Sequence, residues 1–345
     1  MGWGVKSRGR RIGQWLALVV LGTTVLLSCV GLLGCASGTT SASRATPWTG
    51  TSPYLEPSLY PVAVGLDWGF IDKTGNLAMP LEFEGATDFQ EGLAGVKVNG
   101  AWGFIDSRGE VVIKPQFQQV DPFSEGLAAV QEGDRWGYVD YSGKYVIQPQ
   151  FAGAGDFGEG LAPALKNEKD DWGYIDRSGQ FVIEPKFMYG AWKFGDDLAA
   201  VEDEDTMGYV DPSGKYVANN FHVAGNFSGG FAIASVLTGT EGEKYGVINT
   251  KGKFVAKPEF GNGYEFSEGL GAVEKGDLWG YVDETGALVI QPQFKWAFGF
   301  HNGLAQVKVG PGDPGEMAYI DKTGKVIWRE SDATGGSLNS SSSTS

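Results

Sequence analysis

Cysteine and histidine are almost missing from this chain. Among 345 residues there are two cysteines, Cys29 and Cys35, both in an apolar N-terminal stretch, and two histidines, His222 and His301. A disulfide framework and a thiolate metal site are therefore excluded beyond residue 35. The sequence also has no Gly-x-Ser-x-Gly elbow, Gly-rich phosphate loop or His-Glu-x-x-His motif. We expect no metal, no cofactor and no enzymatic activity.

Positive charge is also in short supply. The first 35 residues hold four of the 27 basic residues and none of the 42 acidic ones, so the rest of the chain has a net charge of −19. A surface this acidic repels the phosphate backbone of DNA or RNA, so we expect no nucleic-acid partner.

The N-terminus has the pattern of an export signal. A basic segment, Lys6 to Arg11, precedes an uncharged stretch from Trp15 to Leu33, and Gly34-Cys35 comes next, before small polar residues. This order resembles bacterial lipoprotein signal peptides, in which the cysteine becomes the lipidated first residue. The resemblance implies a signal peptide over residues 1–35, lipidation of Cys35, and a membrane-anchored protein of the cell envelope that faces the periplasm or the exterior. An uncleaved membrane helix is the alternative, because the stretch is long enough to span a bilayer.

Two segments lack hydrophobic periodicity. Residues 36–53 are rich in Ser, Thr, Gly and Pro and are predicted to be a flexible linker, and residues 331–345 are predicted to be a disordered tail. This leaves residues 54–330 for the folded part.

The folded part is an internal repeat. Trp-Gly pairs, or degenerate forms of them, recur every 34 to 38 residues and begin at Trp68, Trp102, Trp136, Trp172, Met207, Tyr245, Trp279 and Met317. In one copy, residues 126–130, 136–140 and 145–147 are predicted strands separated by Gly-containing turns, and Pro149 closes the third. Part of the connector, over residues 117–123, is a candidate for a fourth short strand.

The copies share four blocks: Trp-Gly-aromatic-aliphatic-Asp, Ser/Thr-Gly, Ile-x-Pro-x-Phe and Phe-x-Glu-Gly-Leu-Ala. The chain thereby resembles the WG-repeat (KWG) family over about residues 59–328. We expect an all-β repeat array of about eight antiparallel units with three to four strands each. The array is either a propeller-like ring or an open β-superhelix.

The recurring residues are predicted to be structural. Alternation places Trp136 and Tyr138 on one face of a strand and Gly137 and Val139 on the other, so both faces are apolar and need cover from neighbouring copies. We expect the glycine to admit an aromatic ring of the next copy. The Asp at the end of this strand and the Ser/Thr-Gly after it favour a hairpin turn. The recurring proline is expected to end the third strand, and the Glu before Gly is expected to serve a loop.

Function is then left to residues that break the repeat. Six side chains in the connectors do so and are candidates for ligand binding: Trp192, Trp296, Tyr189, Tyr264, His222 and His301. Alternatively, they fill local core volume. Acidic inserts at residues 168–171 and 202–205 are predicted to be solvated turn tips.

Three functions remain open. The first is a non-catalytic envelope lipoprotein whose array binds or scaffolds a protein partner. The second is a glycan- or cell-wall-binding module. The third is a carbohydrate-active hydrolase that uses two of the many carboxylates.

Overall fold

Short antiparallel strands make up nearly all of the described chain. The computed structural model describes residues 48–54, 58–204, 206–239, 242–310 and 315–335, which belong to one compact unit, Ala42–Ser345. One short helix in this part, α1 (Glu330–Gly335), follows the last strand. No helix among these residues is long and apolar enough to cross a bilayer. The predicted signal peptide with Cys35, linker residues 36–47 and tail residues 336–345 lie outside the described residues.

The strands form eight small sheets, which we number as blades 1 to 8 in chain order. The strands of blades 1 to 4 are, in order, β1 (Leu59–Val64), β2 (Asp67–Asp72) and β3 (Leu77–Phe83); β4 (Gly85–Ala86), β5 (Leu93–Val98), β6 (Ala101–Asp106) and β7 (Val111–Phe117); β8 (Gln119–Val120), β9 (Ala128–Glu132), β10 (Arg135–Val139) and β11 (Tyr145–Phe151); β12 (Gly153–Ala154), β13 (Ala162–Leu165), β14 (Trp172–Ile175) and β15 (Phe181–Phe187).

The second half repeats this plan. The strands of blades 5 to 8 are β16 (Gly190–Ala191), β17 (Ala199–Asp203), β18 (Thr206–Val210) and β19 (Tyr216–Phe221); β20 (Val223–Ala224), β21 (Phe231–Leu237) and β22 (Glu243–Asn249); β23 (Asn262–Ser267), β24 (Leu270–Lys275), β25 (Leu278–Val282) and β26 (Leu288–Phe294); β27 (Trp296–His301), β28 (Leu304–Val309), β29 (Glu316–Asp321) and β30 (Val326–Arg329). Each blade is thus antiparallel with three or four strands, as predicted, and β8 confirms the fourth strand in the connector.

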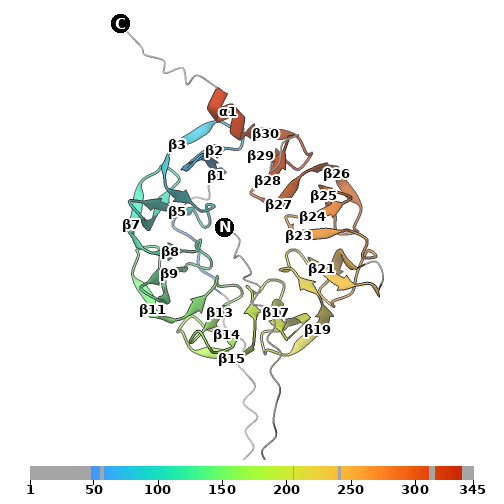
Figure 1. The fold of residues 1–345 in the computed structure, drawn as a ribbon. Coiled ribbons are helices and arrows are strands. Elements are labelled where there is room, and N and C mark those ends of the chain that lie inside the picture. Colours follow the sequence, from blue (N-terminus) through green and yellow to red (C-terminus); the bar gives the residue numbers. More distant parts are fainter. Residues whose placement is uncertain (1–47, 55–57, 205, 240–241, 311–314, 336–345) are drawn as a thin grey trace, which may run out of the picture. The chain divides into compact units, whose positions relative to one another are not determined.

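The blades stand around a central axis and close into a ring (Figure 1). In each four-stranded blade the first strand lies nearest the axis and the last forms the outer rim. Of the two predicted arrangements, the chain therefore adopts the closed one, a β-propeller.

Closure depends on side-chain packing between blades 1 and 8, because each of these sheets is built from its own continuous segment. Tyr60, Val62 and Ile71 of blade 1 form one buried cluster with Leu304, Tyr319 and Trp328 of blade 8. The Tyr319 hydroxyl donates a hydrogen bond to the Pro61 carbonyl at 2.8 Å, and the Tyr60 hydroxyl donates to the Asn302 carbonyl at 2.5 Å.

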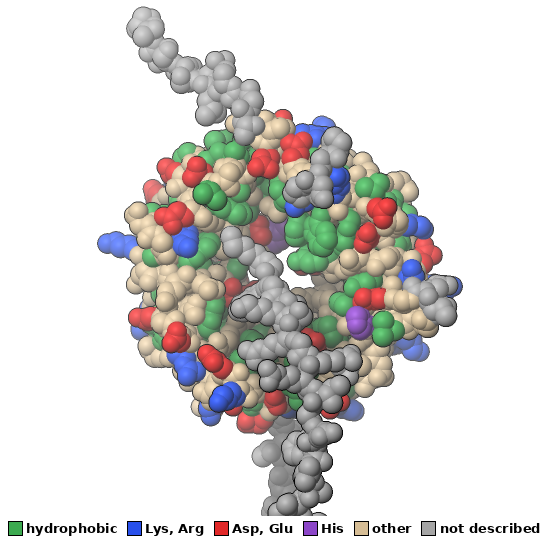
Figure 2. All heavy atoms as spheres, in the orientation of Figure 1, with side chains coloured by type: hydrophobic (Ala, Val, Ile, Leu, Met, Phe, Trp, Pro, Cys, Tyr) green, Lys and Arg blue, Asp and Glu red, His purple; other side chains and the backbone are tan. Residues whose placement is uncertain are grey.

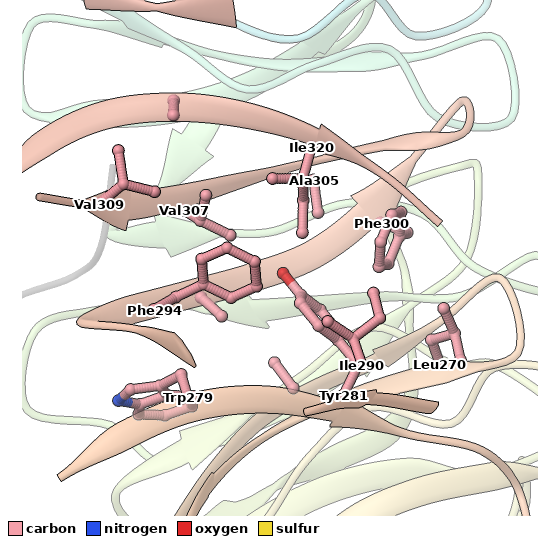
Figure 3. Packing of buried hydrophobic residues seen from close by; sticks show 13 residues of the cluster. Leu270, Trp279, Tyr281, Ile290, Phe294, Phe300, Ala305, Val307, Val309 and Ile320 are labelled. Carbon is pink, nitrogen blue, oxygen red and sulfur yellow. The ribbon is translucent and has the colours of Figure 1, made fainter. Parts of the chain in front are cut away.

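The core is divided into interfaces between adjacent blades. At the interface of blades 7 and 8, Trp279, Tyr281 and Phe294 face Ala305, Val307 and Ile320 (Figure 3). Tyr281 is fully buried, and burying a large apolar side chain stabilises a fold by roughly 1.5–3 kcal/mol. The prediction that the recurring aromatics pack between neighbouring sheets is thus confirmed.

The glycine after each tryptophan has a different role from the predicted one. A Cβ on Gly137 would lie 2.6 Å from the carbonyl oxygen of Ile147 and 2.7 Å from the nitrogen of Pro149, both in the outer strand of the same blade. The outer strand bulges here, since Trp136 pairs with Phe151 and Tyr138 with Ile147. The glycine therefore admits backbone of its own blade, and the prediction of a neighbouring aromatic ring was wrong.

The recurring proline sits inside that bulge. The outer strand β11 runs from Tyr145 to Phe151 and so continues past Pro149. The prediction that proline ends the third strand was therefore wrong, although its place on an edge strand fits, because an edge strand needs fewer backbone donors.

The Asp-x-Ser/Thr-Gly turn is built as predicted. Asp140 Oδ1 accepts hydrogen bonds from the Ser142 amide at 2.9 Å, the Ser142 hydroxyl at 2.6 Å and the Lys144 amide at 3.1 Å. In blade 6, Asn249 Oδ1 accepts from the amides of Lys251 and Lys253. The amide oxygen of Asn249 thus accepts the same backbone hydrogen bonds as the carboxylate oxygen of Asp140. The recurring Asp residues therefore stabilise the turn through an accepting oxygen.

The Glu-Gly turns link successive blades. Glu125 adopts a positive φ of 54°, and its Oε2 accepts a hydrogen bond from the Gly160 amide of the next blade at 3.0 Å. Glu91 binds the amides of Glu125 and Gly126 in the same way, at 2.8 and 2.9 Å. The predicted loop role of this glutamate is confirmed, and it extends across the blade boundary.

Candidate functional site

The wall of the central opening is formed by the innermost segment of each blade. Each of these segments in blades 2 to 8 reaches a buried phenylalanine: Phe89, Phe123, Phe157, Phe194, Phe227, Phe266 and Phe300. We call the two residues before each phenylalanine the axial positions. These positions lie on the segments that surround the opening.

The axial positions differ from one copy of the repeat to the next. In blades 2 to 8 they are, in order, Thr87-Asp88, Asp121-Pro122, Gly155-Asp156, Trp192-Lys193, Gly225-Asn226, Tyr264-Glu265 and Phe298-Gly299. All of these residues keep some exposed surface, although the surrounding walls of the opening desolvate the four carboxyl groups among them. Acidic and histidine side chains line the opening at the centre of the ring in Figure 2.

Two predicted site residues meet in an aromatic patch on blades 7 and 8, which consists of Tyr264, Trp296 and Phe298. The ring centroids of Tyr264 and Phe298 are 5.6 Å apart, and those of Trp296 and Phe298 are 6.3 Å apart. Trp296 also packs on the recurring Trp279 at 4.8 Å. Tyr264 and Trp296 keep 45% and 38% of their surface exposed. Figure 2 shows hydrophobic surface beside the opening, over β23 and β27.

The other four predicted residues are not part of this patch, although His301 lies on the same strand as Trp296. Trp192 occupies the axial position of blade 5, and its carbonyl accepts a hydrogen bond from the Tyr174 hydroxyl at 2.8 Å. His301 follows β27's Phe300, with Nε2 2.5 Å from Nε2 of Gln90 in blade 2. Tyr189 lies before β16 and is 58% exposed, and His222 lies before β20. The six predicted residues therefore do not form one cleft.

Four carboxyl groups at the axial positions were not predicted as site residues. Burial by the surrounding walls, together with the charge of Asp156, raises the pKa of Asp121 to about 7. Burial also raises the pKa of Asp156, with a contribution from Glu91, although Lys193 opposes this. The sequence shows an acidic residue at the axial positions of four of these seven copies, but it does not show that these residues lie near one another.

Across the opening, Asp88 and Glu265 form a second acidic pair. Burial raises the pKa of each carboxyl group, whereas the charge of His301 lowers the pKa of both. Asp88, Glu265 and His301 come from blades 2, 7 and 8. They approach one another because blade 1 has no innermost strand between them.

His222 belongs to a polar cluster that lacks the geometry of a nucleophile and base. His222 Nδ1 is 2.7 Å from Glu243 Oε1, and the Ser235 hydroxyl donates to the same carboxylate oxygen at 2.6 Å. A catalytic serine would instead hydrogen bond to the histidine. The Ser235 hydroxyl also accepts a hydrogen bond from the Val223 amide at 2.9 Å, so the cluster secures the start of blade 6.

The acidic insert at residues 168–171 lies in the turn between β13 and β14. In the second insert, Glu202 and Asp203 belong to β17, and Glu204 follows that strand. Within the described part of the chain, no group of three or more His, Cys, Asp or Glu side chains could hold a metal ion.

A family model described as the WG containing repeat matches residues 68–100, 102–136, 136–169, 172–206, 207–236, 245–279 and 279–310. The chain belongs to this family. Each match in this WG-repeat propeller begins at the central strand of one blade and ends in the following blade, so the sequence repeat spans two sheets. The predicted eighth copy, at Met317, lies beyond these matches, and β29 takes its place in blade 8.

Solved structures resemble the WG-repeat propeller in fold. A crystal structure of the eukaryotic initiation factor has 12% identity and a TM-score of 0.50, and the match covers 79% of this chain and 84% of that chain. The dihydro-heme d1 dehydrogenase NirN has 12% identity and a TM-score of 0.49, covering 83% and 75%. Virginiamycin B lyase from Staphylococcus aureus has 14% identity and a TM-score of 0.39, covering 70% and 96%. No curated protein matches the chain.

Proposed function

We propose that this WG-repeat propeller is a non-catalytic scaffold of the cell envelope that docks a protein partner on the surface around its axial opening. The aromatic patch of Tyr264, Trp296 and Phe298 carries this proposal. It is exposed on a rigid ring, and two of its members break the repeat. Large aromatic side chains that are fixed in place supply much of the binding energy of protein interfaces.

Membrane anchoring is the second part of the proposal. The basic segment, the uncharged stretch and Gly34-Cys35 support cleavage before Cys35 and lipidation of its thiol. The intact mass of the protein purified from its own membranes tests this. We expect a chain that begins at residue 35 and carries acyl groups, and a Cys35→Ser variant that lacks them. A wild-type mass that includes Met1 would refute cleavage.

The axial carboxyl groups favour binding over hydrolysis. A carboxylate pair that hydrolyses glycosides needs one group held protonated and the other held ionised. Asp121 and Asp156 do not form such a pair of one protonated and one ionised carboxyl group, because burial raises the pKa of both.

Glycan binding is the competing function, and the half-exposed ring of Trp296 supports it, since an exposed indole can stack on a sugar. A cross-linking capture from an envelope extract, run in parallel with a glycan array, separates the two. We expect the wild type to capture a defined protein, and a Tyr264→Ser, Phe298→Ser variant to lose it. The control is Val111→Ser, an exposed position on the outer strand β7. Saturable glycan binding without a captured protein would favour glycan binding over protein docking as the function.

A further inference from the structure

The wall of the opening over blades 3 to 5 carries more negative than positive charge among the described residues. Asp121 and Asp156 are close enough for each charge to act on the other. Glu91 adds a third negative charge that acts on Asp156. Among the described residues, Lys193 of blade 5 acts on Asp156, and Arg177 acts on Glu91.

Lys193 is engaged elsewhere. Its Nζ donates a hydrogen bond to the Ser124 hydroxyl at 2.7 Å, and that hydroxyl donates to the Phe157 carbonyl at 2.7 Å. Asp156 Oδ1, in contrast, is buried and has no hydrogen-bond partner among the described residues. A buried acceptor left without a donor costs about 1–3 kcal/mol, so this oxygen favours a ligand that brings an N–H group.

We infer that Asp121 and Asp156 bind an alkylammonium group at this wall of the opening. An ammonium supplies both the charge and the donors that the pair lacks. An inorganic divalent ion fits less well, since no metal-holding cluster occurs among the described residues.

The ammonium can come from a lysine side chain of a docked partner or from a free polyamine. This inference rests on the proposed binding function, but its site on blades 3 to 5 is separate from the aromatic patch on blades 7 and 8. Loss of cation binding and loss of partner capture are therefore distinguishable by the two sets of variants.

Isothermal titration of the full chain in detergent, at about 150 mM salt, tests the site with three probes: acetyl-trilysine amide, the same peptide with acetylated side chains, and spermine. We expect saturable binding of trilysine, of spermine or of both, and none of the acetylated peptide. Trilysine alone would identify a partner's lysine as the source, and spermine alone would identify a polyamine.

Matched variants locate the binding. Asp121→Asn with Asp156→Asn is expected to weaken the affinity at least tenfold. Asp134→Asn, in the β9–β10 turn, is expected to leave it unchanged. Lys193→Gln is expected to strengthen it, because a competing charge is removed, which a purely structural change would not do. The double variant should unfold at the same temperature as the wild type or higher, because it removes two buried charges. Absence of binding by both cations, or equal affinity in the wild type and the double variant, would overturn the inference.

Discussion

At the scale of single residues, the molecule separates two kinds of position. Recurring residues maintain the fold. Gly137 lies against the backbone of a bulged strand, and Asp140 accepts the hydrogen bonds that stabilise a turn. The Tyr138 hydroxyl donates a hydrogen bond to the Gly155 carbonyl of the next blade at 2.8 Å. Residues at the axial positions differ from copy to copy and lie on the segments around the opening. Chemistry that is specific to this protein is therefore concentrated at the second kind.

Replacing Gly137 by Ala tests the role assigned to the recurring glycine. The new Cβ would meet backbone atoms of Ile147, Gln148 and Pro149 within 2.9 Å, and backbone cannot move aside as a side chain can. We expect a loss of about 1–3 kcal/mol in the free energy of unfolding, measured by urea denaturation. Gly261→Ala is the control, since its nearest neighbour would be 3.9 Å away. Equal stability of the two variants would contradict the close approach.

The raised pKa of Asp121 predicts how stability changes with pH. Its pKa rises from 3.8 to about 7 in the fold, through burial and the charge of Asp156. The folded state therefore prefers the protonated form, and the stability that this group contributes is present below about pH 4 and is lost as the pH rises to about 7. Tyr138 also faces this pair, and Lys193 acts on Asp156.

Thermal unfolding of the Asp121→Asn variant from pH 4 to pH 8 measures this effect. We expect its advantage over the wild type to grow as the pH rises and to level off above pH 7, whereas Asp134→Asn should show no such trend. A variant that is less stable than the wild type at pH 8 would contradict the buried charge.

At the scale of elements, the strands and turns were largely predictable and the bulge was not. Alternation within a copy located the inner and central strands, and the Asp and Gly spacing located the hairpin. The proline was misjudged because its effect depends on how Trp136 and Tyr138 pair with the neighbouring strand. Sequence periodicity along one strand does not contain that pairing.

Asp140 offers a test of turn chemistry at this scale. Burial of its carboxylate favours the neutral form, but hydrogen bonds from Ser142 and Lys144 outweigh this and lower its pKa. We expect Asp140→Ala to lower the free energy of unfolding by about 1 kcal/mol, because it removes the acceptor. Asp140→Asn should cost less, as Asn249 shows in blade 6. The Ala and Asn variants can be compared by urea denaturation at pH 7, and an equal loss in both would indicate that charge, rather than the accepting oxygen, matters.

At the scale of the whole molecule, ring closure creates the candidate site. Asp121 and Asp156 are 35 residues apart, and Asp88 lies much farther from His301, yet each pair interacts across the axis-facing wall. The aromatic exceptions could be recognised in the sequence as breaks in a pattern. The carboxyl groups could not be recognised as a group, because only the closed ring brings seven separate connectors to one axis.

The central claim is that recurring residues hold the blades together and the exceptions bind. The most direct measurement is the unfolding temperature with and without saturating trilysine or spermine, for Trp136→Leu and Asp156→Asn. Trp136 is 4% exposed and packs between blades, whereas Asp156 occupies an axial position that differs from copy to copy. We expect Trp136→Leu to unfold at a lower temperature with an undiminished ligand-induced shift, and Asp156→Asn to keep at least the wild-type temperature with a smaller shift. The reverse assignment of the two effects would contradict the claim.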